Sequence, residues 1–303
     1  MENGIEVIGI DHGWAQMKTV SEVFTSGVEE IVNEPAFFDD VLEYQGKYYK
    51  IGGERLKVKR TKVEDENYYL LTLAALAKEL DNRGKREANV VLAVGLPLTR
   101  FSDERDKFIS YLSKNEKITF SYEERIYQIK VSKVSVYPQC YSAVANQISS
   151  FGKKVLVVDV GSWTIDSMPI INKKPDDTKC DTQNHGLITC MNDIKKKCIR
   201  QLNSTIDEMD IQEYMMIGKT DLNEHFKAIM DACIQSFVEK VYHSLRESGY
   251  NLETMTIIFV GGGACVMKNF GKHQTSNISY VLDVKANAKG FETLAKIAMR
   301  SGR

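Results

Sequence analysis

Two aspartates of this chain each end a run of β-forming residues and are followed, two positions later, by a glycine. These D-x-G sequences begin at Asp11 and at Asp159. Glycine lets the backbone bend tightly and approach a ligand without a Cβ in the way. Amides that follow such a glycine converge on one spot and form a concave anion site. We therefore predict that the two turns bind a polyphosphate and that the aspartates hold a hydrated Mg²⁺ beside it.

Other polar groups and glycines lie near these turns. Lys18 falls on the strand predicted after the first turn, where an ammonium would reach a phosphate as a point charge. Thr164 and Asp166 add polar side chains to the second turn. The run Gly261-Gly262-Gly263 follows another predicted strand, and its bare backbone would let a nucleoside lie against it. Taken singly, each feature is also typical of an ordinary hairpin or strand-to-helix turn, so the prediction rests on their ordered combination.

The bulk composition excludes several classes of function. The 303 residues carry a formal net charge of −1, which leaves no large positive field for binding bare nucleic acid. The apolar run at residues 5–10 is too short for a secretory signal or a membrane span. None of the six cysteines forms a C-x-x-C pair, so zinc and thioredoxin-like chemistry are not indicated, and scattered thiols suit a reducing cytoplasm. The cysteines are Cys140, Cys180, Cys190, Cys198, Cys233 and Cys265.

Strands and helices alternate along the chain, which predicts an α/β fold. The two D-x-G sequences lie 148 residues apart, about one domain, and this repeat predicts a duplicated architecture. The composition and periodicity predict strands at 5–10, 17–24, 41–44, 47–51, 90–94, 126–136, 155–158, 165–171 and 255–260, with polar loops at 58–67 and 173–184. Helices are predicted at 68–80, from a cap at Ser102 or Asp103 through Leu112, and at 141–148, 188–202, 222–245 and 288–299.

In this order the motifs resemble those of the superfamily of two-lobed ATPases that contains actin, hexokinase and the heat-shock chaperones. Within it the chain is most similar to the bacterial actin-like proteins of the ParM/StbA type, which segregate low-copy plasmids. The resemblance covers essentially the whole chain and leaves no room for a chaperone's peptide-binding domain. It rests on IGIDHGWAQMK (8–18) and VLVVDVGSWTID (155–166) for the phosphate motifs, VYPQCYSAV (136–144) and ANAKGF (286–291) for the connecting helices, IIFVGGGA (257–264) for the adenosine motif, and YQGKYYKIGG (44–53) with VGLPL (94–98) for the ParM type.

The resemblance implies two duplicated, ribonuclease H-like actin domains that flank a nucleotide cleft. Domain I would comprise residues 1–142 and 289–303, with a small subdomain at about 33–66, and domain II residues 143–288. The cofactors implied are ATP and Mg²⁺, with GTP as the alternative nucleotide. Asp11 and Asp159 would organise the metal through its waters. The residues implied to contact the phosphates or border the adenosine are Gly13, Trp14, Ala15, Lys18, Gly161, Ser162, Trp163, Thr164, Gly261, Gly262 and Gly263.

Gln139 follows Pro138 at the start of the expected first connecting helix, and the resemblance implies that it orients the attacking water. ParM-type proteins often carry a carboxylate at this position. A glutamine holds a water but is a poor general base, so we expect a slow ATPase. An ordinary polar residue at a helix start is the alternative. Trp163 and His12 also depart from the usual pattern, and either could alter the preference between ATP and GTP.

The function implied is a cytoplasmic ATPase that polymerises with ATP and segregates plasmid DNA. Its partners would be other copies of itself and a DNA-binding adaptor at a centromere-like site, without direct contact to DNA or a membrane. One alternative is a small-molecule kinase of the same superfamily, in which Asp166 would be the base. The others are a cell-shape or division homologue of actin and a scaffold that keeps nucleotide as a structural ligand. The lysines at 195–197 are expected to be a solvated helix face.

Overall fold

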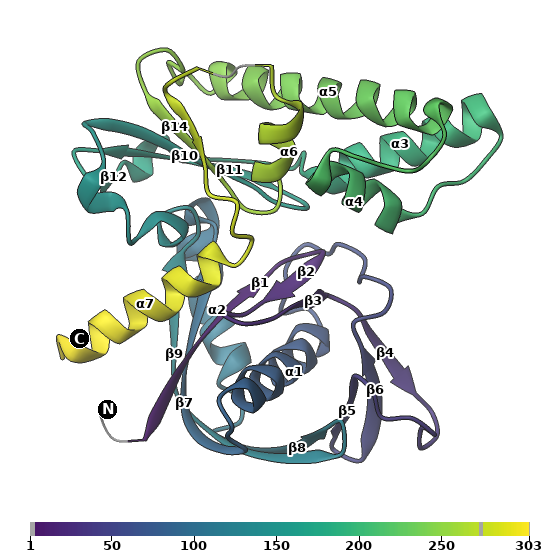
Figure 1. Cartoon of the computed structure of the whole chain (residues 1–303). Helices are drawn as coiled ribbons and strands as arrows, with labels where there is room; N and C mark the ends of the chain where they lie inside the picture. The colour runs from purple at the N-terminus through teal and green to yellow at the C-terminus, as the bar shows by residue number, and fades with distance from the viewer. Residues whose placement is uncertain (1–3, 273–274, 303) are drawn as a thin grey trace. The chain divides into compact units, whose positions relative to one another are not determined.

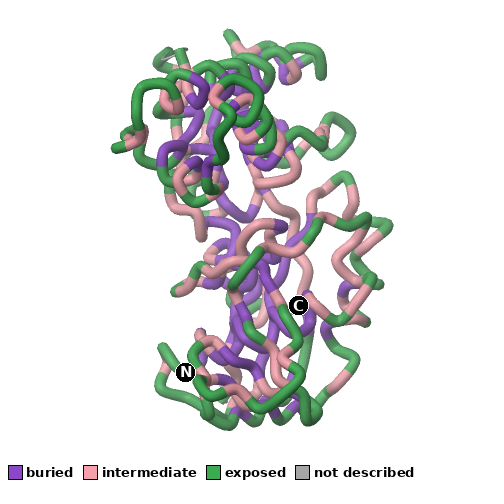
Figure 2. The backbone as a smooth tube through the Cα atoms, turned by 90° about the vertical axis from the view of Figure 1, so that its right-hand side faces the viewer, coloured by how far each residue is buried: buried purple, intermediate pink, exposed green. Residues whose placement is uncertain are grey.

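The computed structural model describes residues 4–272 and 275–302. The chain folds into two compact units, each with its own mixed sheet. Unit 1 comprises Met1–Ala145 together with Lys285–Arg303, and unit 2 comprises Asn146–Val284. In each unit the central strands are buried and the outer turns and helix faces are exposed, as Figure 2 shows. The predicted alternation of strands and helices is confirmed.

Unit 1 is built on a sheet in the order β3-β2-β1-β7-β9-β8-β5-β6-β4 (Figure 1). Its three central strands run parallel, while the others pair antiparallel. The strands are β1 (Ile5–His12), β2 (Gln16–Lys18), β3 (Val23–Thr25), β4 (Val28–Ile31), β5 (Val41–Tyr44), β6 (Lys47–Ile51), β7 (Glu87–Leu96), β8 (Lys117–Tyr122) and β9 (Arg125–Pro138).

Helices cover both faces of this sheet. Helices α1 (Asn67–Asn82) and α2 (Phe101–Leu112) reach one face, where His12 of β1 meets Thr72 of α1 and Phe108 of α2. Helix α7 (Ala286–Arg300) covers the other face. Because side chains alternate along a strand, Val7 lies on the opposite face from His12 and packs against α7.

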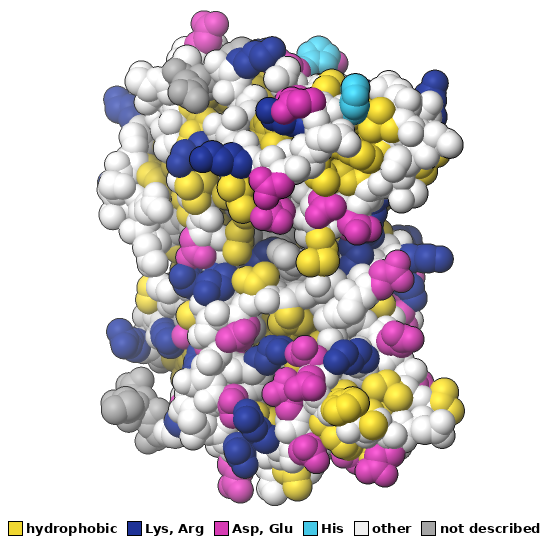
Figure 3. Space-filling model, turned by 45° about the vertical axis from the view of Figure 1, so that its right-hand side comes forward, with side chains coloured by type: hydrophobic (Ala, Val, Ile, Leu, Met, Phe, Trp, Pro, Cys, Tyr) yellow, Lys and Arg dark blue, Asp and Glu magenta, His cyan; other side chains and the backbone are white. Residues whose placement is uncertain are grey.

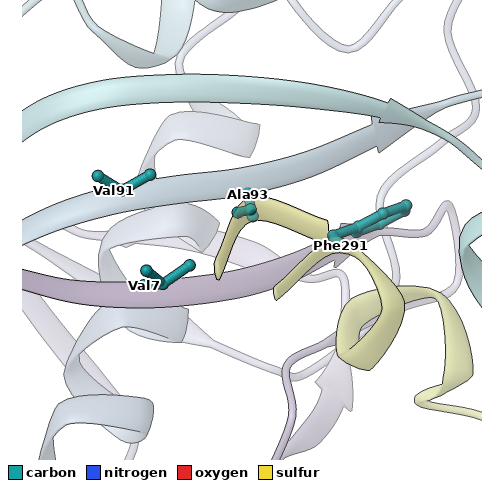
Figure 4. Packing of buried hydrophobic residues seen from close by; sticks show 5 residues of the cluster. Val7, Val91, Ala93 and Phe291 are labelled. Atoms are coloured by element: carbon teal, nitrogen blue, oxygen red, sulfur yellow. The ribbon is translucent and has the colours of Figure 1, made fainter. Parts of the chain in front are cut away.

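The contact between α7 and the sheet is close and apolar. Val7, Val91 and Ala93 of the sheet pack with Phe291 and Ala295 of the helix (Figure 4). Gly9 makes room for the helix backbone, because a Cβ there would lie 2.1 Å from the carbonyl oxygen of Ala288. The chain's last helix is thus fixed against the strand that carries Asp11.

Unit 2 has a smaller sheet in the order β12-β11-β10-β14-β15, with β13 paired to β11. Its strands are β10 (Lys154–Val160), β11 (Ile165–Ile171), β12 (Lys174–Pro175), β13 (Asp181–Gln183), β14 (Thr256–Val260) and β15 (Ile278–Tyr280). Its helices are α3 (Leu187–Leu202), α4 (Glu208–Ile217), α5 (Glu224–Glu247) and α6 (Ala264–Phe270).

Four of the sequence predictions were wrong. Residues 141–148, expected to form a helix, contain the short 3-10 turn Ser142–Val144, and a second one follows at Ile148–Ser150. The expected strand at 17–24 is divided into β2 and β3, which pair antiparallel around a turn. Helix α2 begins at Phe101, before Ser102 and Asp103, and no side chain caps it. The polar loop expected at 173–184 also contains β12 and β13.

The described helices include none that is both long and apolar enough to cross a membrane. On the face drawn in Figure 3, cationic and anionic side chains are interspersed, in keeping with a net charge near zero.

Candidate functional site

The first D-x-G turn lies in unit 1 between β1 and β2. The antiparallel register sets Asp11 directly opposite Lys18. The Lys18 ammonium lies 3.4 Å from the Asp11 carboxylate, and both side chains are largely buried. The turn itself is made by Gly13, Trp14 and Ala15. The structure therefore brings the predicted carboxylate, lysine and turn together.

Gln139 reaches the same carboxylate from another strand. It follows β9 directly, and its backbone amide donates to the carbonyl oxygen of Leu96 at 2.9 Å. Its side-chain amide donates to the free oxygen of the Asp11 carboxylate at 3.0 Å. The next residue, Cys140, has a φ of +62°, a left-handed conformation that turns the chain away from the strand. Asp11 is thus held between one ammonium and one amide.

The first turn is braced by its own backbone and by Tyr68 of α1. The Gly13 amide donates to the Asp11 carbonyl at 3.1 Å, so in this structure its hydrogen bond lies within the turn. The Gly13 carbonyl accepts from the Ser26 hydroxyl at 2.8 Å and from the Tyr68 hydroxyl at 3.2 Å. Trp14 is buried, with its ring edge-on to Tyr68 at 5.6 Å between centroids. The indole therefore fixes the turn against unit 1.

Sequence reasoning missed Lys62, which comes from the polar loop before α1. Its ammonium lies 5.6 Å from the Trp14 ring centroid and 5.9 Å from that of Tyr68, within cation–π range. Burial lowers the pKa of Lys62 to about 8, although the nearby Asp11 charge opposes that shift. A lysine in a polar stretch carries no motif, so only the fold shows that a second cation lies near the first turn.

His12 lies beneath this turn and is fully buried. Its Nε2 is 2.9 Å from the Thr72 hydroxyl oxygen. That hydroxyl donates its own hydrogen to the Tyr68 carbonyl at 2.6 Å, so Nε2–H is the donor to Thr72. The ring also lies edge-on to Phe108. Burial lowers the pKa of His12 to about 3, which keeps the imidazole neutral at physiological pH.

The neutral state of His12 predicts a pH dependence of stability. Below pH 6.5 the unfolded chain takes up a proton that the folded chain refuses until about pH 3, so stability falls as the pH falls. The slope from this one group reaches at most about 1.4 kcal/mol per pH unit. Urea unfolding of the parent and His12→Gln between pH 7 and pH 5 should show a shallower pH dependence in the variant. His225, which is exposed, provides the control as His225→Gln, and equal slopes for all three proteins would contradict the assignment.

The second D-x-G turn lies in unit 2 between β10 and β11. Asp159 pairs with Asp166 across the two strands, at the same offset that separates Asp11 from Lys18. The Gly161 amide donates to the Thr164 carbonyl at 2.9 Å and closes the turn. The Asp166 carboxylate accepts from the Thr164 hydroxyl at 2.8 Å and from Thr182 at 2.5 Å. Thr164 therefore orients Asp166 in this structure.

The start of α3 supports the second turn, a feature that the sequence prediction missed. The amides of Gly186, Leu187 and Ile188 donate to the carbonyls of Trp163, Gly161 and Ser162, at 2.9, 3.1 and 2.8 Å. A Cβ on Gly186 would lie 2.6 Å from the backbone of Ser162, so glycine is needed for this approach. The carbonyls of the turn are thus drawn toward the helix, and Ser162 and Trp163 stay partly exposed.

The glycine run after β14 packs beside Asp159. Gly261 has a φ of +78°, and a Cβ there would lie 2.1 Å from the Asp159 carboxylate. Gly263 donates its amide to the Val160 carbonyl at 2.8 Å and has no room for a side chain. A Cβ on Gly262 would meet no atom within 4 Å. Close packing therefore explains why glycine is needed at 261 and 263. At Gly262 no neighbouring atom requires glycine, and the space over the end of the strand is open.

Each unit thus presents one buried aspartate at the end of a strand, beside a partly exposed glycine turn. In unit 1 the aspartate is joined to Lys18 and Gln139, and in unit 2 it lies against Gly261. Within the described residues, no cluster of three or more histidine, cysteine or acidic side chains could hold a metal directly.

Two family models match the chain. Residues 9–141 match the model of the actin-like proteins N-terminal domain, and residues 157–272 match that of the C-terminal domain of the archaeal actin homologue MreB-like proteins. No curated protein matches the chain.

Solved structures share the fold at low sequence identity. The archaeal actin homologue Ta0583 in complex with ADP has a TM-score of 0.74 at 19% identity, over 96% of this chain and 99% of that one. ParM of Bacillus thuringiensis with AMPPNP has a TM-score of 0.72 at 10% identity, over 98% and 100%. The Alp12 filament structure has a TM-score of 0.69 at 15% identity, over 98% and 100%.

The α/β fold of two actin-like domains is confirmed by these matches, as is the resemblance read from the sequence. The two family models follow each other in the expected order and fall one on each unit. The chain therefore belongs to the actin-like proteins, and among them it resembles ParM.

Proposed function

We propose that this protein binds ATP with Mg²⁺ and hydrolyses the γ-phosphate. The observation that carries the proposal is the repeated hairpin, in which a buried aspartate ends a strand beside a glycine turn in each unit. Each unit would contribute its phosphate turn to nucleotide binding, and the two units would act as the actin-like domains I and II. The small subdomain of domain I would lie at about residues 33–66.

The residue roles follow the two turns. Asp11 and Asp159 would hold Mg²⁺ through its waters, and the metal would neutralise charge on the phosphates. Amides of Trp14, Ala15, Ser162 and Trp163 would bind phosphate oxygens, with Thr164 beside them. The Gly13 and Gly161 amides, which close the turns in this structure, would reach the phosphates only by leaving those bonds. Lys18, already at Asp11, would contact the phosphates. The glycines 261–263 would border the adenosine, and the open space at Gly262 supports this role.

Gln139 would orient the attacking water. Its amide nitrogen is bonded to Asp11, which leaves the carboxamide oxygen to accept a hydrogen bond from that water. Since this oxygen is not basic, it would position the nucleophile without removing its proton, and turnover would be slow.

We further propose that ATP drives this protein into filaments that segregate plasmid DNA in the cytoplasm through a DNA-binding adaptor. The support is the likeness in fold to the Alp12 filament structure and to ParM. A net charge of −1 offers little counterion release on DNA, which favours an adaptor over direct contact.

Phosphate release from purified protein without any added acceptor tests the catalytic proposal. An ATPase releases phosphate from ATP in the presence of Mg²⁺, with GTP as a parallel arm. A kinase releases phosphate only with its acceptor, and a scaffold binds nucleotide without turnover. The position of Asp166 does not favour a kinase, because both its carboxylate oxygens accept threonine hydroxyls. Tight nucleotide binding without phosphate release would overturn the proposal.

A further inference from the structure

Unit 2 has a groove of about 680 Å³ between α3 and α5. Residues from Thr189 to Arg200 of α3 and from Cys233 to Glu247 of α5 line it, together with Ile165 and Gln183. The groove lies within unit 2 and does not include Asp159 or the glycines at 261–263. It is therefore a separate feature from the candidate nucleotide site.

The rim of this groove is basic. Lys196, Lys197 and Arg200 come from α3, and Lys240 faces them from α5. None of these four forms an ion pair with another residue in the described part of the chain. The lining also holds two carboxylates, of which Glu247 is 3.3 Å from His243. A chain of net charge −1 thus concentrates unpaired cations along one groove.

The structure distinguishes among the lysines at 195–197, which were expected to form a solvated helix face. Lys195 forms an ion pair with Glu208 at 2.7 Å, as expected of an ordinary helix surface. Lys196 and Lys197 instead lie on the groove, opposite a cation from a helix some forty residues later in the chain. Like charges that converge from two helices repel one another, which raises the electrostatic free energy unless a partner of opposite charge is bound. The sequence alone does not reveal that these cations converge.

The floor of the groove is apolar. Cys233, Phe237 and Val241 recur at every fourth residue of α5 and form one buried stripe. Cys190 of α3 lies beside them, and burial raises the pKa of its thiol to about 12, so the thiol is neutral.

We propose that this groove binds an acidic, amphipathic helical segment of a partner protein. The apolar side chains of such a helix, at positions i, i+4 and i+7, would lie on the floor. Aspartates or glutamates beside them would pair with Lys197 and Arg200 on one side and Lys240 on the other. The cations would also speed association and favour acidic partners over basic ones.

The test uses a fluorescein-labelled synthetic helix with leucines at i, i+4 and i+7 and flanking glutamates, and measures its anisotropy on the full chain. Two variants disable the groove in different ways. Lys197→Glu/Lys240→Glu reverses one charge on each rim, while Ser236→Trp fills the groove from an exposed lining position without changing charge. Lys153→Glu/Lys154→Glu makes the same change at exposed lysines outside the groove.

We expect each groove variant to weaken binding of the acidic helix by roughly 10-fold or more, as loss of close charge pairs or of the apolar contact does. The Lys153/Lys154 control should bind like the parent, a scrambled peptide of equal composition should bind weakly, and added salt should reduce affinity. Absence of binding to the parent, equal loss in the control variant, or a groove-dependent preference for duplex DNA over the acidic helix would each overturn the proposal.

Discussion

Replacement of Asp159 by alanine is expected to reduce ATP turnover on the order of 100-fold, the upper range for removing a group that orients a bound metal. The carboxylate belongs to the penultimate residue of β10, is buried, and lies against Gly261. Without it the proposed Mg²⁺ loses one anchor for its water shell, and the phosphate is less well neutralised. Phosphate release at saturating ATP and Mg²⁺ measures the loss.

Two further variants make this result specific. Asp159→Asn keeps the shape of the side chain but removes its charge. Its ATP turnover should therefore be as low as that of Asp159→Ala, while its free energy of unfolding should match that of the parent. Asp177→Ala removes an exposed carboxylate from the same unit and should leave turnover unchanged. An Asp159→Ala protein that is folded and hydrolyses ATP at the parent rate would show that this carboxylate does not serve the metal.

Gln139→Ala is expected to separate binding from chemistry. Loss of one group that positions the nucleophile costs about 100-fold in turnover in pre-organised sites. Nucleotide affinity should change little, because the proposed contact is with water. Single-turnover kinetics together with a direct measurement of ATP binding gives both quantities.

The hydrogen bond from Gln139 to Asp11 sharpens this test. If the glutamine served only to hold Asp11, its loss would weaken Mg²⁺-dependent nucleotide binding and turnover together. Gln128→Ala, at an exposed position of β9, the strand that precedes Gln139, is the control and should match the parent. Equal losses of affinity and rate in Gln139→Ala would mean that the residue supports the aspartate and that the water is held elsewhere.

The parts of the fold that were predictable are those whose turns use residues with local preferences. The β5–β6 hairpin was predicted at its observed bounds, because Gln45-Gly46 takes the two positive φ values, +52° and +73°, that a two-residue turn needs. Strand β11 was likewise predicted at its observed bounds, since it follows a D-x-G turn and both begins and ends with isoleucine, a β-former.

The missed elements lack such signals. Strand β8 joins β9 through Glu123-Glu124, whose φ values are +51° and +61° without a glycine or asparagine, so no turn is indicated. The turn before β12 also takes two positive φ values, at Asn172 and Lys173; Asn172 is a turn residue, but Lys173 carries no such signal. Helix α4 has exposed Met209 and Ile217 as well as buried apolar residues, so it presents no single apolar face.

The candidate site shows the same division. Asp11 and Lys18 were predictable as neighbours, because a short turn between two strands sets them opposite each other. Lys62 and Gly186 were not, because each reaches its turn from a separate element brought there by packing. The periodicity of apolar residues predicts which face of a helix or strand is buried, but it does not predict which loop packs over that face.

The central claim is that an actin-like ATPase uses the γ-phosphate to control its own assembly. A ligand shifts an equilibrium only by its different affinity for the two states, and here that difference would come from the phosphate that ADP lacks. Head-to-tail contacts that do not close on themselves then give filaments. Light scattering with sedimentation, at micromolar protein with ATP, a non-hydrolysable analogue, ADP or no nucleotide, tests this directly. The account predicts polymer with ATP and the analogue and much less with ADP or without nucleotide, whereas no polymer with either triphosphate, in protein that hydrolyses ATP, would contradict it.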